Sequence, residues 1–178
     1  MSAEDRRSAD RQKNIDKTSV SIAATASGTL AGFGVAVLTL ILALSPKVTK
    51  PQALLLLLQI LGAAIVFLIV SIDFYVVASW KEEVYERFGT YGSLSYGIGV
   101  SLLMVAVALM MVVISPSAPV GYTILALTWI GWVIHYGLRL KYAGPDPHPI
   151  LRLVTRITMF AIIFCGIVLV YVIERGCF

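Results

Sequence analysis

The sequence predicts an all-α fold: a polytopic membrane helix bundle with five transmembrane helices. Hydrophobic residues make up 58% of the 178 residues and charged residues only 13%, and the mean hydropathy is +0.88. An ordinary soluble domain is about half apolar and about a quarter charged. The apolar residues also gather into five long runs, separated by short polar connections. A chain of this composition requires the bilayer as its solvent.

Each of the five runs is long enough to cross a membrane as a helix. A helix rises about 1.5 Å per residue, so about 20 residues cross a hydrocarbon core of roughly 30 Å. Proline-containing connections (SPKVTKP, SPSAP and GPDPHP) follow the first, third and fourth runs and end their helices, because proline lacks the amide hydrogen. No run alternates apolar and polar residues as barrel strands do. The expected spans are 19–44, 52–79, 92–114, 119–140 and 150–173.

The distribution of lysine and arginine predicts the orientation. Residues 1–18 form a polar N-terminal tail, and residues 19–178 form the five-helix transmembrane domain. Of the 14 basic residues, all but Lys47, Lys50 and Arg175 fall in the tail or in the second and fourth connections, which share one side. The positive-inside rule therefore predicts a multi-pass protein of the cell (inner) membrane, with a cytoplasmic N-terminus and an external C-terminus.

Composition and motifs exclude several classes of function. The net charge of +4 comes from residues between the apolar runs, where membrane topology explains them better than nucleic-acid binding does. The two cysteines form no metal-binding spacing. The chain lacks the convergent nucleophile, base or metal motifs that an enzyme needs. We therefore expect no enzyme activity, no metal, no cofactor and no nucleic-acid partner.

One acid and one imidazole are the most distinctive residues within the spans. Asp73 lies in the stretch SIDFYVVASW near the cytoplasmic end of the second span, and His135 lies at a similar depth in the fourth. Ionisable side chains within a membrane usually face the bundle interior and pair. We therefore hypothesise that the two approach each other, as a structural pair or as a transport or proton site. The alternative is that Asp73 reaches the headgroups or Arg87, while His135 bonds a neighbour.

Further polar side chains enter the bundle at this level and extend the predicted pathway. Ser21 and Thr25 belong to the first span, and Ser95 and Tyr96 to the third. The outer half of the bundle has fewer polar groups. The predicted pathway for an ion or proton consists of Asp73, His135, Ser21, Thr25, Ser95 and Tyr96.

Small residues recur at helical spacing in the first and third spans. Gly28 and Gly32 form a GxxxG element, and Gly92 and Gly99 form a shorter stripe with Ser95. Such stripes permit close contact between helices, within the bundle or within an oligomer. The alternative is that the first span lines a narrow pore.

Basic residues flank the cytoplasmic ends of the fourth and fifth spans. Residues of one sign beside an anionic leaflet are typical of contacts with lipid headgroups. We assign this role to Arg139, Lys141, Arg152 and Arg156. The charged run KEEVYERFG after the second span is interpreted as a solvated surface, with a partner site as the alternative.

Two functional hypotheses from different classes follow. The first is a homo-oligomeric channel or small transporter for a cation or proton, with a polar cavity on its cytoplasmic side. The second is a non-transporting scaffold or a subunit of a larger membrane complex. The polar layer in the inner half of the bundle favours the first.

Overall fold

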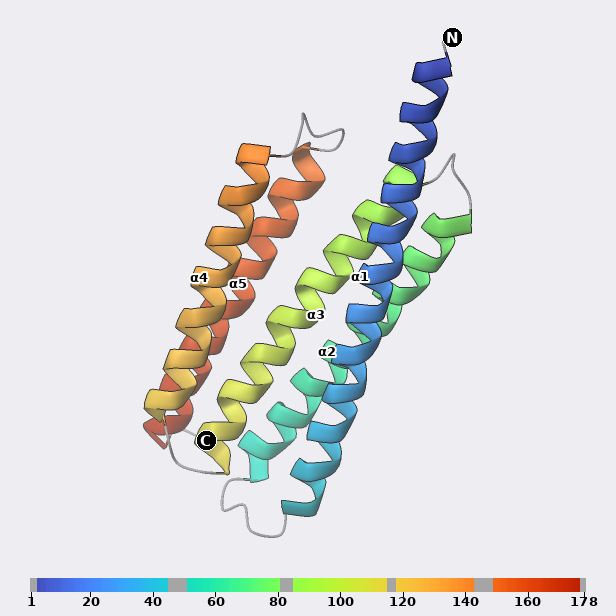
Figure 1. Cartoon of the computed structure of the whole chain (residues 1–178). Helices are drawn as coiled ribbons and strands as arrows, with labels where there is room; N and C mark the ends of the chain where they lie inside the picture. Colours follow the sequence, from blue (N-terminus) through green and yellow to red (C-terminus); the bar gives the residue numbers. More distant parts are fainter. Residues whose placement is uncertain (1–2, 45–50, 81–84, 115–117, 143–148, 177–178) are drawn as a thin grey trace.

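The computed structural model is a bundle of five helices and describes residues 3–44, 51–80, 85–114, 118–142 and 149–176 (Figure 1). The helices are α1 (Ala3–Leu44), α2 (Pro51–Trp80), α3 (Tyr85–Val113), α4 (Ala118–Tyr142) and α5 (Pro149–Glu174). No strand occurs among these residues. The predicted all-α fold with five helices is confirmed.

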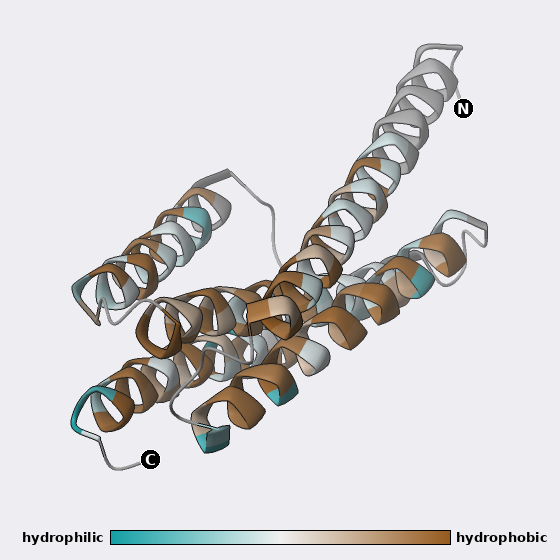
Figure 2. Cartoon of the chain, turned by 90° about the horizontal axis from the view of Figure 1, so that it is seen from below, coloured by the Kyte–Doolittle hydropathy of each residue, from teal (hydrophilic) through white to brown (hydrophobic). Residues whose placement is uncertain are grey.

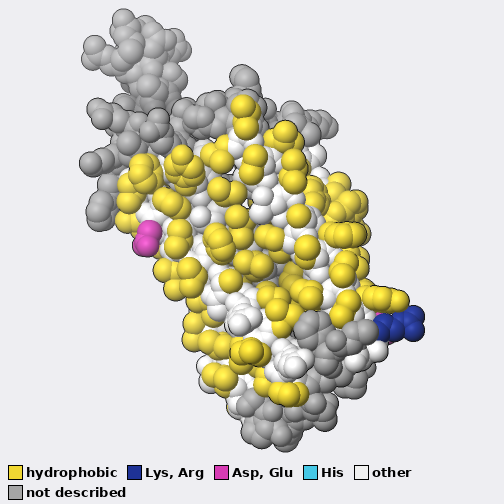
Figure 3. All heavy atoms as spheres, turned by 180° about the vertical axis from the view of Figure 1, so that it is seen from behind, with side chains coloured by type: hydrophobic (Ala, Val, Ile, Leu, Met, Phe, Trp, Pro, Cys, Tyr) yellow, Lys and Arg dark blue, Asp and Glu magenta, His cyan; other side chains and the backbone are white. Residues whose placement is uncertain are grey.

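Each helix is long and apolar enough to cross a membrane. The apolar segments are Thr18–Leu44, Pro51–Ser79, Phe88–Val113, Ala118–Leu138 and Leu153–Glu174. Hydrophobic residues dominate along the helices in Figure 2, and hydrophobic side chains cover most of the described face in Figure 3. Large apolar side chains such as Ile22, Leu127 and Phe164 are exposed on this outer surface. Because water would penalise such a surface, the chain is a multi-pass membrane protein.

Helix α3 lies at the centre of the bundle. It packs against α2, α4 and α5, while α1 packs mainly against α2 (Figure 1). Leu103 and Leu109 of α3 are fully buried, as are Leu61 and Leu68 of α2. The core is thus built around the α2–α3 contact, and α4 and α5 join it from the other side of α3.

Glycines allow the close approach of α2 and α5 to α3. The Tyr75 ring of α2 covers Gly92, where an added Cβ would lie 2.8 Å from its Cε1. At Gly99 an added Cβ would lie 2.8 Å from Leu68 Cγ and 3.1 Å from the Leu68 backbone nitrogen. Gly97 faces the Met159 side chain of α5 in the same way. These glycines therefore serve as the small residues that membrane helix contacts favour.

The two glycines of the GxxxG element in α1 contribute less to packing within the chain than Gly34 of the same helix, where an added Cβ would lie 2.8 Å from Ile65 Cγ1. An added Cβ at Gly28 would make an ordinary 3.7 Å contact with Ile72, and one at Gly32 would have no atom within 4 Å. The contact between α1 and α2 instead contains a buried hydrogen bond of 2.9 Å, donated by the Ser71 hydroxyl to the Ser27 hydroxyl. Gly92 and Gly99 thus pack against another helix of the chain, as predicted. At Gly32 the described residues provide no such contact.

The helix boundaries follow the prediction closely, with two differences. α1 begins at Ala3 rather than at residue 19, because its polar start holds helix formers such as Ala, Glu and Arg, without glycine or proline. α3 begins at Tyr85 rather than at residue 92. Residues 81–84 of the charged run KEEVYERFG lie outside the described residues.

The two ends of the chain lie at opposite ends of the bundle (Figure 1). We call the end at which α1 begins its apolar segment the N-side and the opposite end the C-side. α2 and α4 end on the N-side, and α3 and α5 begin there. An odd number of crossings places the termini on opposite sides of a membrane.

Candidate functional site

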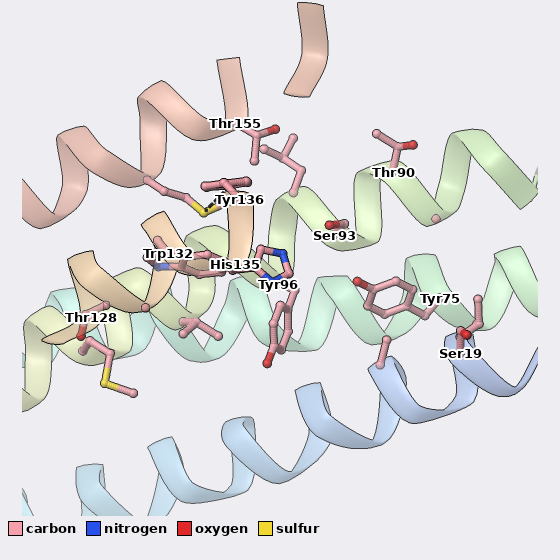
Figure 4. A pocket seen from close by; sticks show the side chains of 18 residues that line it. Ser19, Tyr75, Thr90, Ser93, Tyr96, Thr128, Trp132, His135, Tyr136 and Thr155 are labelled. Carbon is pink, nitrogen blue, oxygen red and sulfur yellow. Dashed lines mark hydrogen bonds between the residues drawn. The ribbon is translucent and has the colours of Figure 1, made fainter. Parts of the chain in front are cut away.

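A cavity of about 1010 Å³ opens within the N-side half of the bundle, and all five helices line it (Figure 4). We call it the N-side cavity. It lies between α1 and α2 on one side and α4 and α5 on the other, with α3 between them. Its volume is at the upper end of the range typical of small-molecule sites.

Helix α4 presents one face to the N-side cavity. The lining residues recur along this helix at helical spacing, each lying three or four positions from another: Thr128, Gly131, Trp132, His135 and Tyr136. Residues at this spacing share a face of a helix, because one turn takes 3.6 residues. The intervening side chains Ile130 and Ile134 are exposed on the outer surface. The imidazole therefore lies on the cavity-lining face of α4, where it is exposed.

Helix α3 supplies the floor of the cavity. Its lining residues include Thr90, Ser93, Tyr96, Val100 and Met104. Hydroxyl groups come first, near the N-side, and apolar side chains follow deeper in the bundle. Met104 lies 14 residues after Thr90, which corresponds to about 21 Å along the helix axis at 1.5 Å per residue. The cavity thus changes from polar to apolar along its length.

The other helices close the cavity around this floor. Ser19, Val20 and Ala23 of α1 contribute one wall, and Tyr75 of α2 contributes a ring that is only 7% exposed. Thr155 and Met159 of α5 complete the opposite wall. In Figure 4 the labelled hydroxyl, indole and imidazole side chains surround a common space.

Aromatic rings cluster on the α4 side of the cavity. The His135 ring centroid lies 5.7 Å from that of Trp132 and 5.6 Å from that of Tyr136, both in edge-on arrangements. The Tyr136 hydroxyl contacts Met159 Sδ at 3.3 Å (Figure 4). Edge-on contacts fix the orientation of neighbouring rings. The imidazole is held among rings at the wall of the cavity.

A guanidinium group lies directly behind this cluster. The Arg156 Cζ is 4.9 Å from the centroid of the Tyr136 ring, within the distance of a cation–π contact. The Arg156 Nε is buried and has no hydrogen-bond partner among the described residues. Arg156 was predicted to contact lipid headgroups, and in the structure it supports a cavity-lining ring. The side chains of Arg139, Lys141 and Arg152 lie outside the described residues.

Asp73 does not line the N-side cavity. Its side chain is exposed, whereas Tyr75, two positions later, lines the cavity. Two residues correspond to a rotation of about 200° around a helix, so the two side chains point to opposite faces of α2. The structure brings His135 into the cavity and leaves Asp73 on the outer surface of α2. The hypothesised approach of these two groups finds no support within one chain.

The position of Asp73 along α2 accounts for an exposed acid. It lies 22 residues after Pro51, about 33 Å along the helix axis. This length slightly exceeds the roughly 30 Å of the hydrocarbon core. We therefore expect the carboxylate close to the headgroup level of the N-side, as in the alternative considered from the sequence, and this stays a prediction.

The remaining predicted pathway residues divide between the cavity and other surfaces. Tyr96 lines the N-side cavity. Ser21 and Thr25 are exposed on α1 and line a separate, shallower pocket of about 470 Å³. Ser95 is 6% exposed and does not line either space. The polar layer predicted from depth alone is thus distributed over several faces of the helices.

Some lining residues were not selected from the sequence. Thr90, Trp132 and Thr155 are three of them. Their helical spacing to other polar residues could have identified them: Thr90 lies three positions before Ser93, and Thr128 lies four positions before Trp132. Among the residues that the structure describes, no acidic side chain lines the N-side cavity.

Comparison with models of known protein families, with curated proteins and with solved structures gives no match for this chain. The functional argument therefore depends on the geometry of the N-side cavity.

Proposed function

We propose that the protein is a channel or small transporter in which a proton, and any solute that moves with it, passes through the N-side cavity. The observation that carries this proposal is a cavity of about 1010 Å³, lined by all five helices, in an otherwise apolar bundle. Packed helical cores rarely contain spaces much larger than a water molecule. A space of this size with an imidazole and several hydroxyls suits a binding site.

The imidazole of His135 is the group we assign to the proton. Histidine is the side chain whose ordinary pKa lies closest to neutral, so it exchanges a proton under physiological conditions. Hydroxyl groups of Ser93, Tyr96 and Thr90 also line the cavity and can relay a proton directly or through water. The described lining residues hold no carboxylate, and such a lining suits a proton better than a hydrated metal cation, which prefers several anionic or carbonyl oxygens.

The orientation gives the pathway a direction. The N-side carries eleven of the 14 lysines and arginines of the chain. The positive-inside rule therefore favours a cytoplasmic N-side, and the N-side cavity then opens toward the cytoplasm of a cell-membrane protein.

A scaffold or subunit role is the second candidate, because one face of α1 is exposed in the described part of the chain. Ser21, Thr25, Gly32, Ala36 and Thr39 are exposed on this helix. Small side chains favour close association with another membrane helix, from a second copy or from another protein. Homo-oligomerisation through α1 is compatible with transport, whereas a heterologous partner without transport favours the scaffold.

The direct test measures proton flux into liposomes that contain the purified protein and an entrapped pH-sensitive dye. A potassium diffusion potential supplies the driving force. We expect flux above that of protein-free liposomes, and a decrease of about tenfold or more in His135→Ala, because a positioned acid–base group is lost.

Asp73→Asn serves as the contrasting variant in this assay. Since Asp73 points away from the N-side cavity, we expect its flux to equal that of the wild type. Flux equal to that of empty liposomes in the wild type would exclude the transport proposal and leave the scaffold. A large loss in Asp73→Asn with no loss in His135→Ala would place the pathway elsewhere.

A further inference from the structure

The arrangement of α1 and α4 bears on what can enter the N-side cavity. The two helices line opposite walls, yet they are not among the helix pairs that pack extensively in the described structure. Figure 1 shows α3 lying between them. Both helices also expose apolar side chains on their outer surfaces, so a molecule dissolved in the bilayer would reach the cavity between α1 and α4.

The polarity of the cavity matches a molecule with a polar head and an apolar tail. Ser19, Thr90 and Thr155 line its N-side end, at the level of the headgroups. Val100 and Met104 line its deep end, about 21 Å away when counted along α3. One leaflet contributes about 15 Å of hydrocarbon, half of the roughly 30 Å core. The cavity is therefore long enough to hold an extended lipid chain.

The charges at the N-side end favour a negative head. Arg156 lies about three residues inside the apolar segment of α5, behind the lining residue Tyr136. Its Nε is buried without a hydrogen-bond partner among the described residues, and a guanidinium has five donors to satisfy. The described lining residues include His135 and no acid. An entering phosphate or carboxylate would meet the imidazole and the hydroxyl groups of this lining, with the positive charge of Arg156 behind Tyr136.

We propose that the N-side cavity binds an anionic amphiphile, with its apolar chain along α3 and its charged head near Arg156 and His135. This inference rests on the proposed function, because it names the class of solute that occupies the same cavity. An organic cation fits less well, since the Tyr136 ring already faces one cation 4.9 Å from its centroid.

Binding can be followed through the fluorescence of Trp132, which lines the cavity. The chain has three tryptophans, and Trp80→Phe with Trp129→Phe leaves Trp132 as the reporter. The full-length protein is placed in nanodiscs of zwitterionic lipid. The probes are a single-chain lipid phosphate with a brominated chain, a neutral monoacylglycerol brominated at the same positions, and inorganic phosphate.

We expect saturable quenching by the lipid phosphate, with an apparent affinity about tenfold or more above that of the neutral lipid, because a charged hydrogen bond is worth about 1.5–3 kcal/mol. Inorganic phosphate should neither quench nor compete. Equal quenching by the charged and neutral lipids overturns the inference. Competition by inorganic phosphate identifies a free anion as the ligand. Absence of saturable quenching means that the cavity is closed to lipid, for example by a second copy.

Arg156→Gln should lower the affinity for the lipid phosphate to that for the neutral lipid, and Arg156→Lys should restore part of it. The matched control is Arg175→Gln, which removes a guanidinium 5.3 Å from the Tyr171 ring on the C-side. Its affinity should equal that of the wild type. The affinity of Arg156→Gln for the lipid phosphate could instead equal that of the wild type, with the same Trp132 emission before lipid is added. This result would mean that Arg156 does not contribute to binding.

The flux experiment and the binding experiment test the two proposals independently. Proton flux without saturable quenching retains the transport proposal and rejects the amphiphile. Saturable quenching by the lipid phosphate without proton flux retains the ligand class and rejects the transport proposal.

Discussion

Gly131→Phe is expected to reduce proton flux to the level of liposomes without protein. Gly131 lines the N-side cavity, and an added Cβ there has no atom within 4 Å. A phenyl ring at this position can therefore enter the cavity without displacing the backbone. It would occupy the space beside Trp132 and His135 and exclude both water and solute.

Gly137→Phe is the matched control on the same helix. An added Cβ at Gly137 also has no atom within 4 Å, but the residue does not line the cavity. Six residues separate the two glycines, which corresponds to a rotation of about 240° around α4. The ring at this position would extend into lipid, and flux should equal that of the wild type. Loss of flux in both variants, or in neither, would contradict the assignment of the pathway to the cavity.

The largest expected effect on stability belongs to Gly99→Val. Leu68 Cγ and its backbone nitrogen lie 2.8 and 3.1 Å from an added Cβ at this position, and Leu68 is fully buried. The α2–α3 contact would have to separate, and overpacking of this kind costs about 1–3 kcal/mol. For a chain of this size, each kcal/mol lowers the unfolding midpoint by about 2–4 °C.

The apparent unfolding midpoint can be measured in detergent by the loss of the monodisperse peak in size-exclusion chromatography after heating. Gly62→Val is the control, because an added Cβ at Gly62 in α2 has no atom within 4 Å. We expect its midpoint to lie within about 2 °C of the wild type, since a site with free space lacks the overpacking cost. Equal midpoints in the two variants would mean that α2 and α3 are not in close contact at Gly99.

The fold could be predicted from the sequence because bilayer thickness fixes the length of a spanning helix. Five apolar runs of sufficient length, separated by proline-containing or charged connections, leave an all-α bundle as the only consistent solution. The predicted span 52–79 and the observed α2 (Pro51–Trp80) differ by one residue at each end. Depth along each helix was accessible from the same argument, which is how His135 and Tyr96 were selected.

The direction of each side chain around its helix was not accessible. A helix that is apolar on all sides has no polar face to distinguish lipid from core. Asp73 and His135 lie on the N-side half of their helices, but Asp73 points to the outer surface of α2, while His135 faces the cavity. Helix spacing within α4 identifies one shared face, but only the packing of the helices shows that this face is opposite Ser19 and Tyr75.

The glycines illustrate the same limit of sequence patterns. The GxxxG element of α1 is the stronger motif, yet Gly32 is exposed and an added Cβ there would have no described atom within 4 Å. Three close contacts are made by Gly92, Gly97 and Gly99 of α3, and one each by Gly34 of α1, Gly121 of α4 and Gly166 of α5. α3 is central and packs against three helices, so it requires small residues on more than one face.

The central claim is that water enters the bundle from the N-side as far as the floor formed by α3. Single cysteines at Ser93 and Ser101 test it most directly, in a chain in which Cys165→Ala and Cys177→Ala remove the native thiols. Ser93 lines the cavity, whereas Ser101, on the same helix, is fully buried. A membrane-impermeant maleimide should modify the Ser93→Cys variant from the N-side only and leave Ser101→Cys unmodified. Resistance of Ser93→Cys to the reagent added on the N-side would contradict the account.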